Sequence, residues 1–183
     1  MLIKNTTESY GAVTQLLHWI MFLLIVWIIT VGFVMTDMEN GPDKFQLYGM
    51  HKTTGVIILF LVVLRIIWKQ LNTSPLLPNT LDEWQKYAAR AGHVLLYALM
   101  VSMPLSGWAM SSAAGFAVSV FGWFTLPNIV APNKELLAAF RELHEIGAYL
   151  FIITILLHIT AALLHHFYYR DNVLQRILPF RKK

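Results

Sequence analysis

Two histidines lie fourteen residues apart in the largely apolar stretch Leu143–Tyr169 of this 183-residue chain. On a helix this spacing returns His158 to within about 40° of the face of His144, about 21 Å further along the axis. Ionisable side chains at membrane depth are costly and are normally retained with a partner. The pair therefore predicts imidazole sites at two depths of a bilayer, although a buried histidine bonded to a carbonyl oxygen is the simpler alternative.

The elements that must position these histidines are four apolar runs. The chain is 57% hydrophobic and 13% charged, whereas a soluble domain has about 25% charged residues. Each run can cross about 30 Å of hydrocarbon as a helix, and the first is too long for the apolar part of a signal peptide. The predicted fold class is all-α, an integral membrane four-helix bundle forming a single domain over residues 1–183. The expected spans are 11–36, 46–69, 84–110 and 136–169.

Breaker residues separate the runs. Residues 37–45 contain the sequence NGP and are expected to form a turn, as are the proline-containing residues 70–80. Pro104 and Gly107 are expected to bend the third span. Residues 111–134 are uncharged until Lys134, and their sequence VFGWFTLP is typical of a segment in the membrane interface.

Four spans place both termini on one side, and the Lys and Arg residues indicate which side. The side of the termini holds ten: Lys4, Arg65, Lys69, Lys86, Arg90, Arg170, Arg176, Arg181, Lys182 and Lys183. The opposite side holds four: Lys44, Lys52, Lys134 and Arg141. The positive-inside rule then predicts that both termini are cytoplasmic. The distribution of the net charge of +4 therefore indicates the orientation of the chain in the membrane, and no nucleic-acid partner is expected.

This orientation gives each histidine a depth. His51 and His144 lie at the outer level, and His18, His93 and His158 at the inner level. The chain has no cysteine, which excludes iron–sulfur ligation and covalent c-type haem. A zinc site would need ligands that converge, often with carboxylates, and the spans carry these only near their ends. Paired neutral imidazoles on facing helices instead suit haem b with two histidine ligands, one ring at each depth.

Four glycines and one arginine stand at the same depths. Gly32 and Gly107 lie fourteen residues after the inner-level histidines of their spans, at the outer level. Gly55 and Gly147 follow the outer-level histidines by four and three residues, on the same helix face. Missing side chains let a helix approach a flat macrocycle or simply another helix. At the inner level, Arg65 is expected either to pair with a haem propionate or to reach the headgroups.

The sequence around these histidines resembles a known family. The segments are QLLHWIMF around His18, GMHKTTGVIILFLVVLRIIW around His51, ARAGHVLLYALM around His93, and RELHEIGAYLFIITILLHITAALLHHFYYRDN near the end of the chain. They are similar to the prokaryotic cytochrome b561 family of four-helix di-haem membrane proteins. That family is related to the cytochrome b subunits of nickel hydrogenases and formate dehydrogenases. The resemblance covers essentially the whole chain.

The resemblance implies which histidines are paired. Carried over to this sequence, it implies two non-covalent haem b groups with axial iron ligands His18 with His158 and His51 with His144. It leaves His93 a neighbour of the inner haem, a choice that spacing alone leaves open. It also implies a multi-pass protein of the bacterial inner membrane. The family includes superoxide:ubiquinone oxidoreductases, so superoxide becomes a candidate electron donor.

Three hypotheses about function follow. The leading one is a di-haem b protein that passes electrons between an outer-side donor, with superoxide as a candidate, and ubiquinone or another membrane quinone. The second is an anchor subunit that relays electrons for a partner dehydrogenase or hydrogenase docked on residues 111–134. The third is a metal or proton transporter, which the lack of carboxylates deep in the membrane disfavours.

A quinone site is expected at the inner surface near Arg90, His93 and His165. Quinone reduction consumes protons as well as electrons, and histidine can supply protons near neutral pH. His165 lies seven residues beyond His158, and Arg90 lies one turn before His93. The alternative is that Arg90, His165 and the adjacent His166 only anchor helix ends at the headgroups.

Overall fold

Four long helices make up most of the protein. The computed structural model describes residues 2–78 and 81–179. The helices are α1 (Ala12–Asp37), α2 (Pro42–Gln70), α3 (Glu83–Ala113) and α4 (Lys134–Phe167). Each of the four is long and apolar enough to cross a membrane. The predicted all-α membrane four-helix bundle is thereby confirmed.

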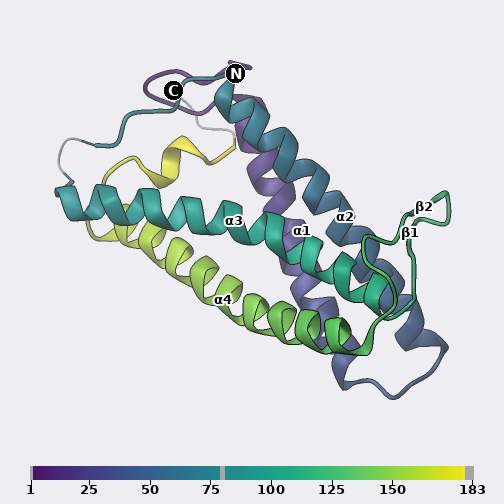
Figure 1. Cartoon of the computed structure of the whole chain (residues 1–183). Helices are drawn as coiled ribbons and strands as arrows, with labels where there is room; N and C mark the ends of the chain where they lie inside the picture. Colours follow the sequence, from purple (N-terminus) through teal and green to yellow (C-terminus); the bar gives the residue numbers. More distant parts are fainter. Residues whose placement is uncertain (1, 79–80, 180–183) are drawn as a thin grey trace.

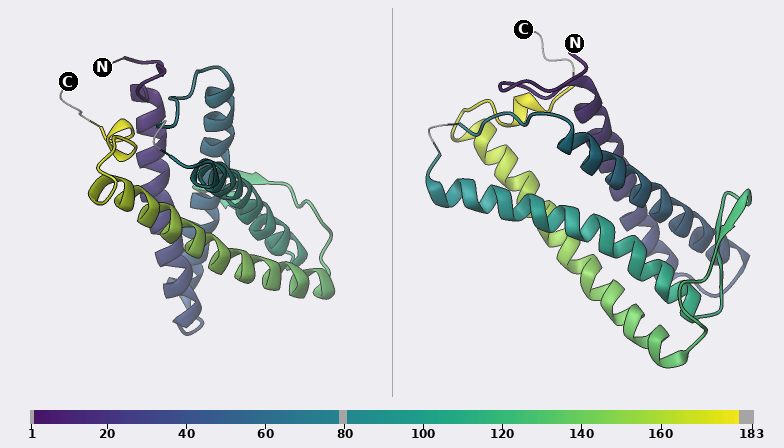
Figure 2. Two further views of the ribbon diagram at one scale, coloured as in Figure 1. Left: turned by 90° about the vertical axis from the view of Figure 1, so that its left-hand side faces the viewer. Right: turned by 45° about the horizontal axis from the view of Figure 1, so that its top comes forward.

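The helices form two antiparallel hairpins. Figures 1 and 2 show α1 beside α2 and α3 beside α4, with the two hairpins crossing at a steep angle. Helix α2 packs against α3 and joins the hairpins. The first and last described segments lie at the same end of the bundle (Figure 1), as an even number of spans requires. Which side of the membrane this end faces stays a prediction.

The buried core lies midway between the two histidine levels. It draws on all four helices and consists of Met21, Ile25, Ile58, Val62, Leu99, Met100 and Phe151. Phe151 illustrates the placement, because it stands seven residues after His144 and seven before His158, or about 10 Å along the helix axis from each. The two levels are thus separated by a packed apolar layer.

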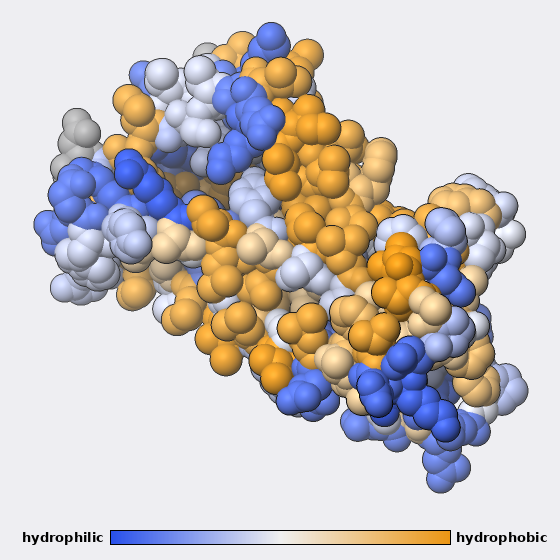
Figure 3. Space-filling model, viewed as in Figure 1, coloured by the Kyte–Doolittle hydropathy of each residue, from blue (hydrophilic) through white to orange (hydrophobic). Residues whose placement is uncertain are grey.

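The outer surface of the bundle is apolar around its middle. Large hydrophobic side chains such as Leu23, Phe60 and Leu157 are 62–66% exposed. Figure 3 shows hydrophobic residues over the middle of the face in view, with hydrophilic residues gathered towards its ends. In water this surface would drive aggregation, whereas in a bilayer it faces acyl chains of similar polarity. The surface therefore agrees with the membrane assignment of the helices.

Several helix ends differ from the expected boundaries. Helix α2 begins at Pro42, inside the expected turn, because proline at the first helical position gives up no hydrogen bond. Helix α3 continues past Pro104 to Ala113. Helix α4 begins at Lys134, where the side chain of Asn133 accepts hydrogen bonds from the first turn at 2.8 and 2.9 Å.

A short antiparallel hairpin occupies the connection between α3 and α4. β1 (Val118–Val120) pairs with β2 (Phe124–Leu126), and β1 lies against α2. Phe121 adopts a φ of 53° in the turn, and the nearby Trp123 is 83% exposed. The sequence predicted an interfacial segment here without strands, because three-residue strands are too short for a recognisable alternation.

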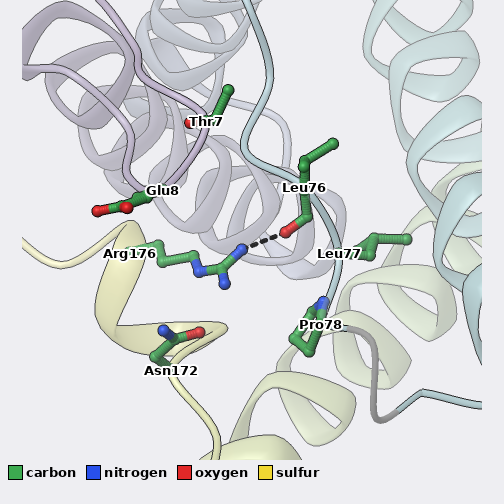
Figure 4. A pocket seen from close by; sticks show the side chains of 7 residues that line it. All are labelled: Thr7, Glu8, Leu76, Leu77, Pro78, Asn172 and Arg176. Carbon is green, nitrogen blue, oxygen red and sulfur yellow. Dashed lines mark hydrogen bonds between the residues drawn. The ribbon is translucent and has the colours of Figure 1, made fainter.

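The N-terminal segment, the α2–α3 connection and the C-terminal segment pack together over one end of the bundle. Figure 4 shows Arg176, from the 3₁₀ helix η1 (Leu174–Arg176), donating to the carbonyl of Leu76. Trp19 Nε1 donates to the carbonyl of Ile177 at 2.9 Å. A polar depression of about 420 Å³ remains between the three segments. Arg181, Lys182 and Lys183, which contribute to the charge argument, lie outside the described residues.

Candidate functional site: two histidine levels

The histidine level nearer the β-hairpin is called the outer level here, and the one nearer the termini the inner level. At the outer level, His51 on α2 faces His144 on α4, with ring centres 6.2 Å apart. A Cβ atom at Gly32 on α1 would stand 3.3 Å from His51 Cε1, and one at Gly107 on α3 would stand 3.2 Å from His144 Cε1. The absence of a side chain at both glycines therefore leaves room for the two imidazoles.

The other two glycines lie against neighbouring helices. A Cβ atom at Gly147 would stand 2.6 Å from the sulfur atom of Met103 on α3, and one at Gly55 would stand 3.7 Å from Ile28 Cδ1 on α1. Gly147 therefore permits close approach of α3 and α4. At Gly55 the contact would be an ordinary one. Neither position contacts a histidine in this arrangement.

Three histidines and an arginine gather at the inner level. The ring of His158 on α4 lies 6.3 Å from that of His18 on α1 and 5.5 Å from that of His93 on α3, measured between ring centres. Arg65 Nη2 on α2 lies 3.0 Å from His18 Nδ1, and the guanidinium lies 5.7 Å from the ring centre of Tyr97. All the inner-level candidates are brought together, so proximity alone does not separate His18 from His93.

The spacing of two pairs fits an iron with one imidazole on each side. Metal–imidazole bonds are about 2 Å long, so two imidazoles on opposite sides of one ion have ring centres roughly 6 Å apart. His51 with His144, at 6.2 Å, and His18 with His158, at 6.3 Å, both match this distance. Within the described residues, no three His, Cys, Asp or Glu side chains converge on one point. The residues present therefore suit a macrocycle that brings its own equatorial ligands.

The residues expected at the quinone site fall into two places. Arg90 is exposed on α3 and lines an apolar depression of about 470 Å³ with Tyr87, Ala91, Val94, Leu95 and Ala98. His93 lies beside His158, whereas His165 Nδ1 lies 2.6 Å from a carboxylate oxygen of Asp171. Among the hydrogen bonds and ion pairs of the described residues, none joins Arg90 to His165.

Two partners of the histidines were missed in the sequence analysis. Ser106 Oγ on α3 lies 2.9 Å from His144 Nδ1, and Asp171 pairs with His165. Ser106 directly precedes Gly107 at the outer level, so a hydroxyl at the depth of a histidine was the available signal. Asp171 lies beyond the end of α4, where the chain folds back towards His165, and helical periodicity could not reveal that contact.

Comparison with known proteins identifies relatives over the whole chain. The family model for prokaryotic cytochrome b561 matches residues 9–180. Cytochrome b561 homolog 2 of Escherichia coli is 30% identical, with 97% of this chain and 95% of that protein covered. Cytochrome b561 homolog 1 of the same organism is also 30% identical, covering 91% of this chain and 94% of that protein. The probable superoxide oxidase CybB of Yersinia pestis is 26% identical, covering 96% of this chain and 98% of that protein.

These matches agree with the four apolar helices. They extend from the N-terminal segment through α4 and into the C-terminal segment, so they include every histidine described above. The protein is a multi-pass membrane protein of the electron-transfer class, and its family implies haem b. The chain belongs to the prokaryotic cytochrome b561 family.

Proposed function

We propose that the chain holds two haem b groups, one between His51 and His144 and one between His18 and His158, and passes electrons between an outer-side donor and a membrane quinone. The observation that carries the proposal is the matched spacing of the two pairs, 6.2 and 6.3 Å between ring centres. Helix α4 contributes one histidine to each pair. Haem b, when bound, supplies an iron that exchanges single electrons.

The chain's own residues hold, separate and shield the two sites. The four histidines would hold the haems, two at each level. The absence of side chains at Gly32 and Gly107 leaves room for the outer imidazoles. Phe151 and the rest of the buried core fill the space between the levels and exclude water from it. His93, 5.5 Å from the ring of His158, is assigned as a neighbour of the inner site and not as a ligand.

The quinone site is assigned to the inner level, near Arg90, His93 and His165. The apolar depression beside Arg90 offers a surface for an isoprenoid quinone. His165 is the proposed proton donor to the quinone, and Asp171, 2.6 Å from its Nδ1, orients the ring. These contacts support a proton-coupled role for His165 beyond anchoring the helix end.

The donor side is assigned to the outer level, with superoxide as the proposed donor. The support is the name of the Yersinia pestis relative, a probable superoxide oxidase. Lys52 directly follows His51 and lies 5.8 Å from the ring centre of Phe116, so a cation stands near the outer pair where it can attract an anion. With both termini in the cytoplasm, the outer level faces away from the cytoplasm across a bacterial inner membrane.

A second candidate function is favoured by the exposed β-hairpin. Phe121, Trp123 and Phe124 are 61%, 83% and 52% exposed, and aromatic residues are enriched in protein interfaces. The chain would then relay electrons for a dehydrogenase or hydrogenase docked on this hairpin. Purification in mild detergent separates the two candidates, because a relay subunit copurifies with its enzyme and is reduced only through it, whereas the proposed oxidase is reduced by superoxide alone.

The haem content of the purified protein tests the main proposal. A pyridine haemochrome assay should give two haems b per chain, and acid–acetone should extract all of them because no cysteine is present to attach either ring. A value of one haem per chain would remove one of the two sites. Haem left in the protein after extraction would exclude the b type.

A further inference from the structure

Ser106 makes two hydrogen bonds in which the donor and the acceptor can be assigned. Its Oγ lies 2.9 Å from the carbonyl oxygen of Met103 and 2.9 Å from Nδ1 of His144. A serine hydroxyl has one proton, and a carbonyl can only accept. The proton is therefore given to Met103, and the Oγ lone pairs are left to accept from His144. This requires the ring proton of His144 to be on Nδ1.

The direction of this bond sets the tautomer of the imidazole. With its proton on Nδ1, a neutral His144 has an unprotonated Nε2, the atom left to bind iron. Ligating histidines commonly donate their other ring N–H to an acceptor, which fixes the ring and makes it a stronger ligand. Ser106 is only 7% exposed, so water does not compete for its Oγ.

The other outer-level histidine has no such partner. Among the described residues, no side chain hydrogen-bonds Nδ1 of His51, which is buried near the backbone of Ile28. At the inner level, Nδ1 of His18 faces the guanidinium of Arg65, which is a donor. At the outer level, the side-chain hydrogen bond to a histidine therefore comes from α3 and acts on His144.

We infer that Ser106 is a positioning residue for the outer haem: it holds His144 in the tautomer and orientation that bind iron, and its accepted hydrogen bond lowers the midpoint potential of that haem. The inference rests on the proposed function, because it takes His144 to be an iron ligand. The potential falls because a ligand whose N–H is hydrogen-bonded donates more electron density and favours the ferric form. A serine that only bonds its own helix at Met103 would have no such effect.

Ser106→Ala tests the inference. We expect the midpoint potential of the outer haem to rise while that of the inner haem stays unchanged, and we expect the apparent dissociation constant of the outer haem to rise about tenfold or more. The low-spin ferric EPR signal of the outer haem should shift as well. Ser106→Thr keeps the hydroxyl and should restore the potential and the EPR signal towards the wild-type values.

Ser102→Ala is the matched control, because Ser102 is an exposed serine one turn earlier on the same helix. It should leave both haems unchanged. An outer-haem potential and EPR signal in Ser106→Ala equal to wild type, or equal shifts in Ser102→Ala, would overturn the inference. His144→Ala distinguishes this failure from that of the proposed function: if His144→Ala retains both haems, the ligand assignment itself is wrong.

Discussion

Nη2 of Arg65 lies 3.0 Å from Nδ1 of His18. Because arginine only donates, Nδ1 of His18 is the acceptor and the proton of the neutral ring is on Nε2. A histidine that binds iron through Nε2 needs that atom unprotonated. Binding of iron by His18 would therefore require Arg65 to release Nδ1, which would leave the guanidinium available to pair with a propionate.

The charge of Arg65 should raise the midpoint potential of the inner haem, since a nearby cation favours the reduced form. Arg65→Met should lower that potential by about 60 mV, which corresponds to one tenfold change in the redox equilibrium. A redox titration followed at the inner-haem absorbance measures the shift. Arg65→Lys keeps the charge and is the control. Equal midpoint potentials in Arg65→Met and wild type would show that the guanidinium lies far from the inner haem.

The inner ligand pair can be separated from its neighbour by substitution. His18→Ala and His158→Ala should each remove the inner haem, whereas His51→Ala and His144→Ala should each remove the outer one. His93→Ala should retain both haems, because the resemblance to the cytochrome b561 family leaves His93, whose ring centre lies 5.5 Å from that of His158, a neighbour of the inner haem and not a ligand. Haem content per chain and difference spectra measure the outcome. Loss of a haem in His93→Ala with retention in His18→Ala would move the inner pair to α3 and α4.

The sequence predicted the elements that depend on long-range periodicity. The four apolar helices and the two histidine levels follow from the length of the runs and from the fourteen-residue spacing on α4. The contact between Arg65 and His18 did not follow, because the direction of a long side chain depends on its surroundings and not on its depth. Ser106 was missed because serine is common in membrane helices and only its contact with His144 distinguishes it.

Local backbone features were the least predictable. The sequence NGP indicated a turn, yet Pro42 begins a helix, because the same residue suits both a turn and a first helical position. The hairpin of β1 and β2 depends on packing against α2, which no local pattern reports. Glycines were identified by their spacing, but their distinct neighbours, the imidazole of His144 for Gly107 and a methionine for Gly147, came only from the structure.

Gly107 should be sensitive to a single added methyl group. A Cβ atom there would stand 3.2 Å from His144 Cε1, so Gly107→Ala should displace the imidazole and shift the spectrum and potential of the outer haem, and Gly107→Val should reduce its occupancy. Gly92→Ala on the same helix is the control, because nothing lies within 4 Å of its Cβ position. That control should stabilise the helix by about 0.5–1 kcal/mol and leave the haems unchanged. Equal spectra in Gly107→Ala and wild type would contradict steric control by this glycine.

The orientation of the chain can be measured with reporter fusions. Ten Lys and Arg residues on the side of the termini against four on the other side predict cytoplasmic termini. A fluorescent protein fused after Lys183 should fluoresce, and alkaline phosphatase fused after Gly122, in the hairpin turn, should be active. A fusion after Thr73, in the α2–α3 connection, is the control and should behave like the C-terminal one. The reverse pattern would place the outer level in the cytoplasm and move the donor side with it.

In the proposed quinone site, His165 and Asp171 act in proton transfer as well as in anchoring the end of α4. Their 2.6 Å contact couples a proton carrier to a carboxylate at the end of α4. His165→Asn, Asp171→Asn and Arg90→Gln should each slow oxidation of the prereduced haems by a soluble quinone, by about 10²-fold or more for His165 because it is the proposed proton donor. The haem spectrum should stay unchanged in all three, since none is a proposed ligand.

His166→Asn is the matched control for this site. His166 is adjacent to His165, but its ring lies against Phe167, with centres 4.8 Å apart, and it has no assigned proton role. The prereduced haems of His166→Asn should therefore be oxidised by the soluble quinone with wild-type kinetics. If His165→Asn and Arg90→Gln also showed wild-type kinetics with intact haem content, quinone would have to react elsewhere, and the hairpin around Trp123 would be the next surface to test. Slowing by His165→Asn alone would keep the proton donor and remove the α3 depression beside Arg90 from the site.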